Sequence, residues 1–406
     1  MQAETISYAR LIRLPNVLAL LASICLSRLA SRMFSVVIVL HTLTAFGSPV
    51  LAGWVAFAAE APGLLVSPLA GALLDRAGAA RGVIADLVFS AALTLVLAIA
   101  IAVHHASPPV LFLLVTAYAV TNPLSVAGVR VLLPRLVPAP ALDRANALDT
   151  SMHAVVDVTG PPLAGALIGL AGAVPAFVAI AVTYAASVLC VARPRDRGSA
   201  NVTRGNLARE AWEGVVYVAR TPLLRGLAIG YSLSNVTWGI LVVAVPVVTA
   251  QYFAAGTWQP VAGMLWAGMG IAGGIGALVS GRLRMYGREV KLMVPCMMAT
   301  AVAVWPITAS LGVPGLAIGL ALVGLLAGPI DVGLLTLRQR RTDPDRLGRV
   351  LAISISANMA GLPIGTALGG MLLAWSPSAA FVAAALASLL AALATWWLIP
   401  GDDRRV

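Results

Sequence analysis

The sequence has few charged residues for its length. Only 11% of the 406 residues are charged, whereas 60% are hydrophobic. A soluble domain carries about 25% charged and about 45–50% apolar residues. Long apolar runs recur from one end of the sequence to the other, so a signal peptide on a soluble body does not account for the composition. The composition therefore excludes a water-soluble globular protein.

The sequence also lacks the residue patterns of common catalytic, metal and redox sites. Cysteine occurs three times, each alone in an apolar run without disulfide or metal-ligand spacing, at Cys25, Cys190 and Cys296. The phosphate-binding Gly-x-x-x-x-Gly-Lys-Ser/Thr loop, His-Glu-x-x-His and Gly-x-Ser-x-Gly are all missing. We therefore expect neither an enzyme nor a metal or cofactor. Without an ATP site, energy has to come from an ion gradient, and acids at membrane depth favour protons.

The sequence does contain a series of apolar segments that are long enough to cross a bilayer as helices, which takes about 20 residues. Twelve spans are expected, at residues 17–41, 49–73, 82–103, 109–133, 149–171, 173–192, 224–250, 261–283, 290–311, 313–336, 347–373 and 378–399. The one long polar connection separates them into two groups of six. The sequence thus predicts an all-α membrane protein with six-helix bundles at residues 1–192 and 224–406 and a linker at 193–223.

Among the connections between the spans, only every second one contains arginine or lysine. These basic residues precede the first span, lie in or beside every second loop, crowd the linker and end the chain, as Arg10, Arg81, Arg197, Lys291, Arg338 and Arg405 illustrate. The positive-inside rule then places both termini and the linker in the cytoplasm of a multi-pass plasma (inner) membrane protein. The net charge of +11 follows from this topology, with some attraction to anionic lipid, and requires no nucleic acid partner.

The two predicted bundles resemble each other. Residues Gly160–Gly169 in the fifth span align with residues Gly361–Gly370 in the eleventh, and five of the ten positions are identical. A duplicated six-helix unit is typical of transporters whose substrate site lies between two similar halves near the bilayer midplane.

One loop signature points to a family. The segment Gly71–Arg81 reads G-A-L-L-D-R-A-G-A-A-R. It resembles the Gly-x-Leu-x-Asp-Arg-x-Gly-Arg-Arg signature of the major facilitator superfamily, at the same place between the second and third helices. Two basic positions of that signature are Ala79 and Ala80 here, which thins its charge network. The resemblance implies a conformational loop motif of Gly71, Asp75, Arg76, Gly78 and Arg81, together with Asp86 and Arg130 in the adjoining helices.

Parts of this motif also have structural interpretations. The Asp75-Arg76 pair can latch the two halves in one state, or it can be a solvated turn in which the aspartate caps a helix N-terminus. The shallow residues Asp86 and Arg130 can simply pair with each other, or with Arg81 and Asp75.

Further segments resemble exporters of the same superfamily. The helix-five motif Gly160, Pro161, Pro162 and Gly165 is similar to the Gly-Pro-x-x-Gly element of drug/proton antiporters. Residues 133–138, 144–148 and 348–350 resemble the branch that holds macrolide-efflux proteins and enterobactin exporters. Glycine and proline in a membrane helix permit close approach and bending, which suits a helix that slides or seals against its neighbour, although static tight packing is the alternative.

Polar and ionisable residues within the spans are candidates for substrate binding and coupling. An ionisable side chain costs at least about 2.5 kcal/mol at the bilayer centre and should face a cavity or a partner. Arginine in the first span is hard to dismiss because it stays charged at any depth. The candidates are Arg28, Arg32, Glu60, His153, Asp157, Asn235, Trp238, Asp331 and Asn358.

These candidates have structural alternatives as well. Glu60 can be a buried, protonated acid bonded to the backbone, and His153 can be an interfacial residue without a role. Asn235, Trp238 and Asn358 can serve helix–helix packing. Among the candidate acids for coupling transport to protons, Asp157 is favoured because it precedes the Gly-Pro-Pro bend by one turn, and we expect Arg28 to lie within its reach.

We therefore predict a monomeric secondary transporter that binds a small molecule and protons and exports amphiphilic compounds, such as drugs or siderophores, by alternating access. Neutralising a buried carboxylate would change which packing is favoured. An importer of a small metabolite is the alternative, and the helix-five motif counts mildly against it. A third hypothesis is a lipid-handling or sensor protein on the same scaffold. An attached soluble domain would favour that hypothesis.

Overall fold

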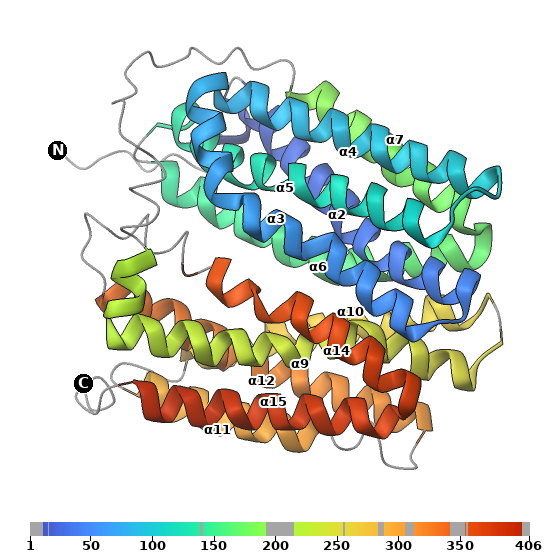
Figure 1. Ribbon diagram of the computed structural model, residues 1–406. Coiled ribbons are helices and arrows are strands. Elements are labelled where there is room, and N and C mark those ends of the chain that lie inside the picture. Colours follow the sequence, from blue (N-terminus) through green and yellow to red (C-terminus); the bar gives the residue numbers. More distant parts are fainter. Residues whose placement is uncertain are drawn as a thin grey trace.

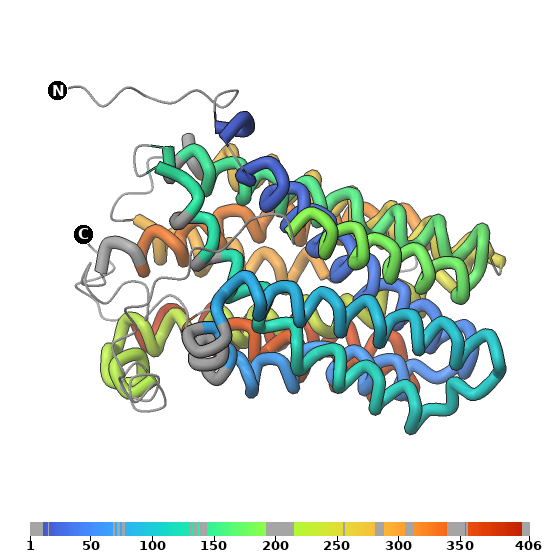
Figure 2. The backbone as a smooth tube through the Cα atoms, turned by 90° about the horizontal axis from the view of Figure 1, so that it is seen from above, coloured from blue at the N-terminus to red at the C-terminus, as the bar shows by residue number. Residues whose placement is uncertain are grey.

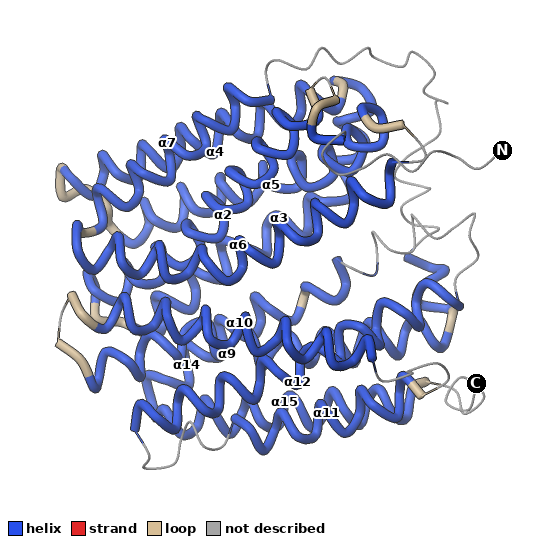
Figure 3. The backbone as a smooth tube through the Cα atoms, turned by 180° about the vertical axis from the view of Figure 1, so that it is seen from behind, coloured by secondary structure: helices blue, strands red, loops and turns tan. Residues whose placement is uncertain are grey.

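A computed structural model describes residues 11–14, 16–138, 141–191, 215–254, 256–282, 288–304, 312–341, 354 and 356–399. Throughout these residues the regular structure is helical and no strand occurs (Figure 3). Side chains in the helix ends around residues 71–73, 75–77, 130–131 and 134–135 lie outside the description.

Each of the twelve predicted spans is a helix in the described part of the chain. The N-terminal bundle consists of α2 (Val17–Phe46), α3 (Pro49–Ala77), α4 (Ala79–Ala102), α5 (Pro108–Leu136), α6 (Leu142–Ala171) and α7 (Ala173–Val191). The C-terminal bundle consists of α9 (Pro222–Tyr252), α10 (Trp258–Arg282), α11 (Glu289–Val304), α12 (Gly312–Arg341), α14 (Gly361–Trp375) and α15 (Pro377–Leu398). Eleven of the described helices are long and apolar enough to cross a membrane. The described part of α11 has 16 residues and falls short of that length.

Proline and glycine set several helix ends. Proline begins α3, α5, α9 and α15, where its missing N–H is not needed. The hydroxyl of Ser48 accepts a hydrogen bond from the backbone N–H of Leu51 and so caps α3. Several helices begin where they were predicted to, as α2, α3 and α7 do, whereas α6 begins at Leu142 rather than at residue 149.

The loop signature lies mostly inside a helix. Helix α3 continues to Ala77, α4 begins at Ala79, and Gly78 alone joins them with a φ of 88°, a conformation that suits glycine. Asp75 therefore belongs to the last turn of α3 and does not cap a helix N-terminus, so that structural interpretation was wrong. A latch role stays a prediction, since the Asp75 side chain is outside the described part.

The two bundles lie side by side, and α2 begins and α15 ends at the same end of the molecule (Figures 1 and 2). Helix α6 packs on α10, and α3 packs on α14. These pairs join the fifth span to the eighth and the second to the eleventh, so they are equivalent under exchange of the halves. The arrangement agrees with the internal duplication read from the sequence.

We call the contacts of α6 with α10 and of α3 with α14, which join the two bundles, the seam. Glycines allow the backbones to meet there: Gly165 faces the carbonyl of Gln259, Gly263 faces Pro161 and Pro162, and Gly53 faces Gly370. At the described glycines, close approaches between the bundles lie in the halves of the helices farthest from the termini. In Figure 1 the ribbons of the two bundles diverge toward the end at which α2 begins and α15 ends.

Candidate functional site

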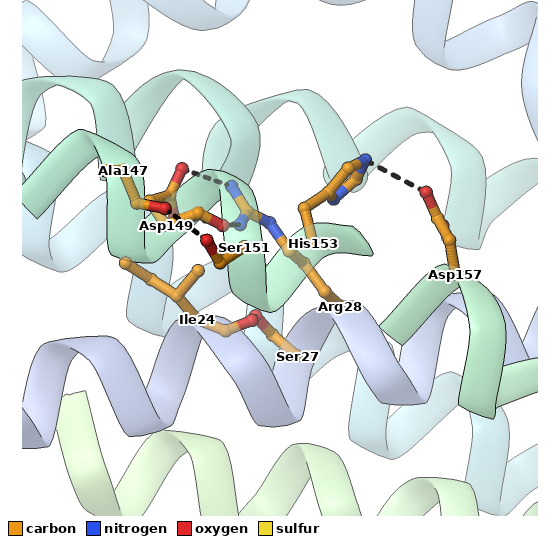
Figure 4. A network of polar contacts seen from close by, with 8 residues as sticks. All are labelled: Ile24, Ser27, Arg28, Ala147, Asp149, Ser151, His153 and Asp157. Atoms are coloured by element: carbon orange, nitrogen blue, oxygen red, sulfur yellow. Dashed lines mark hydrogen bonds and ion pairs between the residues drawn. The ribbon is translucent and has the colours of Figure 1, made fainter. Parts of the chain in front are cut away.

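An ionic cluster joins α2 to α6 at membrane depth. Arg28 binds Asp149 through both guanidinium nitrogens, with Nη1 at 2.8 Å from Oδ1 and Nη2 at 3.1 Å from Oδ2 (Figure 4). Nη1 also donates to the Asp149 backbone carbonyl at 3.1 Å. This bidentate pair occupies three donor contacts of the guanidinium and fixes α2 against the first half of α6.

The next turn of α2 makes a second, more open ion pair. Arg32 Nε lies 2.7 Å from Asp157 Oδ1, and His153 Nε2 lies 3.5 Å from Asp157 Oδ2. The Arg32 side chain is 47% exposed and that of His153 is 56% exposed, against 28% for Arg28. Figure 4 shows His153 pointing toward Asp157 along α6. Together Arg28, Arg32, Asp149, His153 and Asp157 form what we call the ionic cluster, whose Asp157 end is the part open to a ligand or a proton.

The expected pairing of Arg28 with Asp157 was wrong. Helices α2 and α6 sit so that Asp157 is bound by Arg32, one turn beyond Arg28, and Arg28 is occupied by Asp149. Asp149 was not among the predicted site residues. Its signal was present in the sequence, because Asp149, His153 and Asp157 are spaced four residues apart and so share one face of a helix.

Asp157 lies at the edge of the seam. A Cβ added to Gly270 on α10 would meet Val158 first, at 3.1 Å, and the Asp157 backbone carbonyl at 3.9 Å, and Gly160, one turn after Asp157, is packed against the Arg32 side chain. Pro161, Pro162 and Gly165 then form the contact with α10. The helix-five motif thus connects an ion pair inside one bundle with the contact between the bundles.

Two other acids of the N-terminal bundle have different surroundings. Glu60 on α3 is half-buried, and the charge of Arg32 acts on it. Asp86 on α4 is 3% exposed, accepts a 3.5 Å hydrogen bond from Ser90, and lies beside Thr121 and Ser125. The predicted partner Arg130 has its side chain outside the described part, so a pair between them stays a prediction.

In the C-terminal bundle the predicted asparagines meet each other. Asn235 Nδ2 on α9 donates to the Asn358 carbonyl at 3.0 Å, just before α14 begins. With its amide turned to satisfy its neighbours, Asn358 accepts a 2.7 Å bond from Arg338 Nη2 and donates to the Ser354 carbonyl. Arg338, which the sequence placed at a loop, is 3% exposed within α12. These hydrogen bonds join helices, in agreement with the structural interpretation of the asparagines as helix–helix contacts.

A second pair links α9 to α12. The hydroxyl of Tyr231 donates to Asp331 Oδ1 at 2.5 Å, and the pair is exposed. Trp238 stacks on Trp266 of α10 with ring centroids 6.3 Å apart. Tyr231 and Trp266 were missed, because an aromatic residue in an apolar run carries no signal that separates a site from packing.

The family model of the Major Facilitator Superfamily matches this chain twice, over residues 20–283 and 227–406. An uncharacterized MFS-type transporter, y4rN of Sinorhizobium fredii, is 48% identical over 395 residues, which are 97% of this chain and 98% of that protein. The multidrug efflux pump Tap of Mycolicibacterium fortuitum is 28% identical over 355 residues, 85% of this chain and 86% of the pump.

Solved structures share the fold at low identity. A mutant of the nucleoside transporter NupG has a TM-score of 0.76 at 11% identity, with 95% of this chain and 100% of that chain covered. A POT family transporter in complex with a thioalcohol-conjugated peptide has a TM-score of 0.69 at 9% identity, with 93% and 94% covered.

Proposed function

This chain belongs to the major facilitator superfamily, and we propose that it is a proton-coupled exporter of amphiphilic small molecules that works by alternating access. It is a multi-pass membrane transporter. Export is supported by the helix-five motif and by the similarity to a multidrug efflux pump. Drugs remain the leading substrate class, and siderophores rest on the sequence resemblance alone.

The observation that carries the proposal is the position of Asp157 between an ion pair and the seam. Asp157 binds Arg32 with one oxygen and faces His153 with the other, while its backbone borders Gly270 on α10. A proton on Asp157 would weaken the attraction to Arg32. Because the same turn of α6 leads into the seam, this change would favour a different packing of the two bundles.

The bundles are sealed at the seam, which lies away from the termini. With the termini in the cytoplasm, as the arginine distribution favours, this state receives substrate from the cytoplasm. His153, one turn nearer the termini than Asp157, is placed to pass a proton between Asp157 and that side. Alternation then requires the seam to part after the substrate has bound.

Export is tested by the accumulation of fluorescent amphiphilic dyes in cells with and without the gene, with the Asp157→Asn variant as the matched control for expression. We expect lower accumulation in cells that carry the parent protein, and restoration by an agent that collapses the proton gradient. Higher accumulation with the parent than without it would instead indicate an importer.

The topology gives a separate prediction. Reporter fusions after Arg197 and after Pro108 should lie on opposite sides of the membrane, with Arg197 in the cytoplasm, because arginines concentrate in the linker and are missing from the loop near Pro108. The measurement is a pair of reporters that are active on one side only. Activity of the same reporter at both positions would rule out the twelve-span topology.

The loop signature around Asp75 gives a further prediction. Asp75→Asn should reduce transport while the protein remains folded and inserted, if the carboxylate holds one conformation of the cycle through an ionic contact. Asp75→Glu, which keeps the charge, should retain more activity than the amide. Dye efflux per unit of inserted protein measures both variants, and normal efflux by Asp75→Asn would remove the latch role.

A further inference from the structure

One acid of the C-terminal bundle has no basic partner in the described part of the chain. Asp331 is exposed at membrane depth on α12, and its described hydrogen bond comes from a neutral group, the Tyr231 hydroxyl. A carboxylate in this position calls for a partner of opposite charge. The bond to Tyr231 also bridges α9 and α12, which otherwise share few contacts.

The described arginines of the ionic cluster and of α12 are bound to groups other than Asp331. Arg28 is bound to Asp149, and Arg32 to Asp157. Arg338 lies two turns beyond Asp331 on α12, where it is buried and bonded to Asn358. Among these described residues Asp331 is therefore an acid without a matching base, which disfavours an anionic ligand and favours a cationic one.

A second aromatic ring lies on the side of α9 that contacts Asp331. Tyr231 and Trp238 are seven residues apart on α9, so they share one side of the helix about 10.5 Å apart along its axis. Trp238 stacks on Trp266 of α10, and both rings are half-buried. Indole is the strongest aromatic partner of an organic cation. The spacing suits a molecule with a charged head and an aromatic body.

We propose that Asp331, Tyr231, Trp238 and Trp266 bind the substrate as a lipophilic organic cation. The cationic head replaces the Tyr231 hydroxyl at the Asp331 carboxylate, and the aromatic body lies against the two indoles. This inference rests on the proposed transport of amphiphilic small molecules and names their charge. Occupation of Asp331 would also release the bridge between α9 and α12.

The test compares two ions of the same shape and opposite charge, tetraphenylphosphonium and tetraphenylborate, binding to the purified protein in detergent. The parent protein should bind the cation more tightly than the anion. Asp331→Asn should weaken cation binding at least about tenfold, as loss of a charge pair does in a partly desolvated site. The same variant should bind the anion as well as before or better, which shows that the site is intact. Trp238→Leu should weaken both ions.

Glu60→Gln is the matched control, because it neutralises another acid for which the described residues show no ion pair, and it lies in the opposite bundle. It should change cation affinity less than Asp331→Asn. An Asp331→Asn variant within about twofold of the parent, equal losses for both ions, or a larger loss in Glu60→Gln would each overturn the proposal. Binding needs no gradient, so failure here leaves proton coupling at Asp157 standing, and failure of coupling leaves the cation site standing.

Discussion

Asp157→Asn is expected to abolish uphill transport while sparing the exchange of substrate down its gradient. The amide keeps the size of the side chain but cannot take up or release a proton, so the bond to Arg32 no longer depends on protonation. A gradient of one pH unit is worth about 1.4 kcal/mol per proton, or about a tenfold substrate ratio with one proton per substrate. Flux in vesicles with and without an imposed pH gradient should show that ratio falling to about one in the variant.

Asp149→Asn is the matched control for this prediction. It removes a carboxylate from the same face of α6, two turns earlier, and leaves Arg28 without its bidentate partner. We expect lower thermal stability and retained proton-driven accumulation. If Asp157→Asn still concentrates substrate against its gradient, Asp157 is not the coupling acid, and Glu60 and Asp331 become the candidates.

Gly263→Val is expected to block the cycle by keeping the seam from closing. A Cβ at this position would meet backbone atoms only, the Pro161 carbonyl oxygen at 2.5 Å and Pro162 Cα at 2.9 Å, and neither can turn aside as a side chain does. Overpacking of this kind costs about 1–3 kcal/mol. Since the strain arises only in the sealed state, the equilibrium should shift about 5-fold to 150-fold toward the opposite state.

Gly274→Val provides the control on the same helix, because a Cβ there has nothing within 4 Å. Transport should be lost in Gly263→Val and kept in Gly274→Val. A cysteine at Gln259, which is 4% exposed beside Gly165, should react faster with an impermeant maleimide when Gly263→Val is present. Equal transport and equal labelling in the two variants would show that the seam does not need to close.

The sequence was sufficient to predict the helices and to single out Arg28, Arg32 and Asp157, which form ion pairs in the structure. Apolar runs of membrane length leave little choice of secondary structure, because a spanning segment must satisfy its own backbone hydrogen bonds. The register between neighbouring helices could not be predicted from the sequence. A slide of one turn, about 5.4 Å, separates a pairing of Arg28 with Asp157 from the observed pairing of Arg32, and long side chains accept either.

Partners on distant helices were also beyond sequence reasoning. The helix-five motif indicated close approach, but nothing in it identified Gly263 on α10 as the opposing residue. Arg338 was grouped with loop arginines, because a basic residue near a span end usually faces water, whereas here Asn358 accepts its hydrogen bond. Tyr231 was indistinguishable from a packing aromatic until α12 brought Asp331 to its hydroxyl.

The most direct measurement of proton-coupled transport is proton movement driven by substrate in proteoliposomes that enclose a pH-sensitive dye. With no imposed pH gradient, a substrate gradient should drive protons in the opposite direction through the parent protein. Asp157→Asn should pass substrate without moving protons. Proton coupling at Asp157 would be contradicted if substrate passed through the parent protein as fast as through the variant while the internal pH stayed constant.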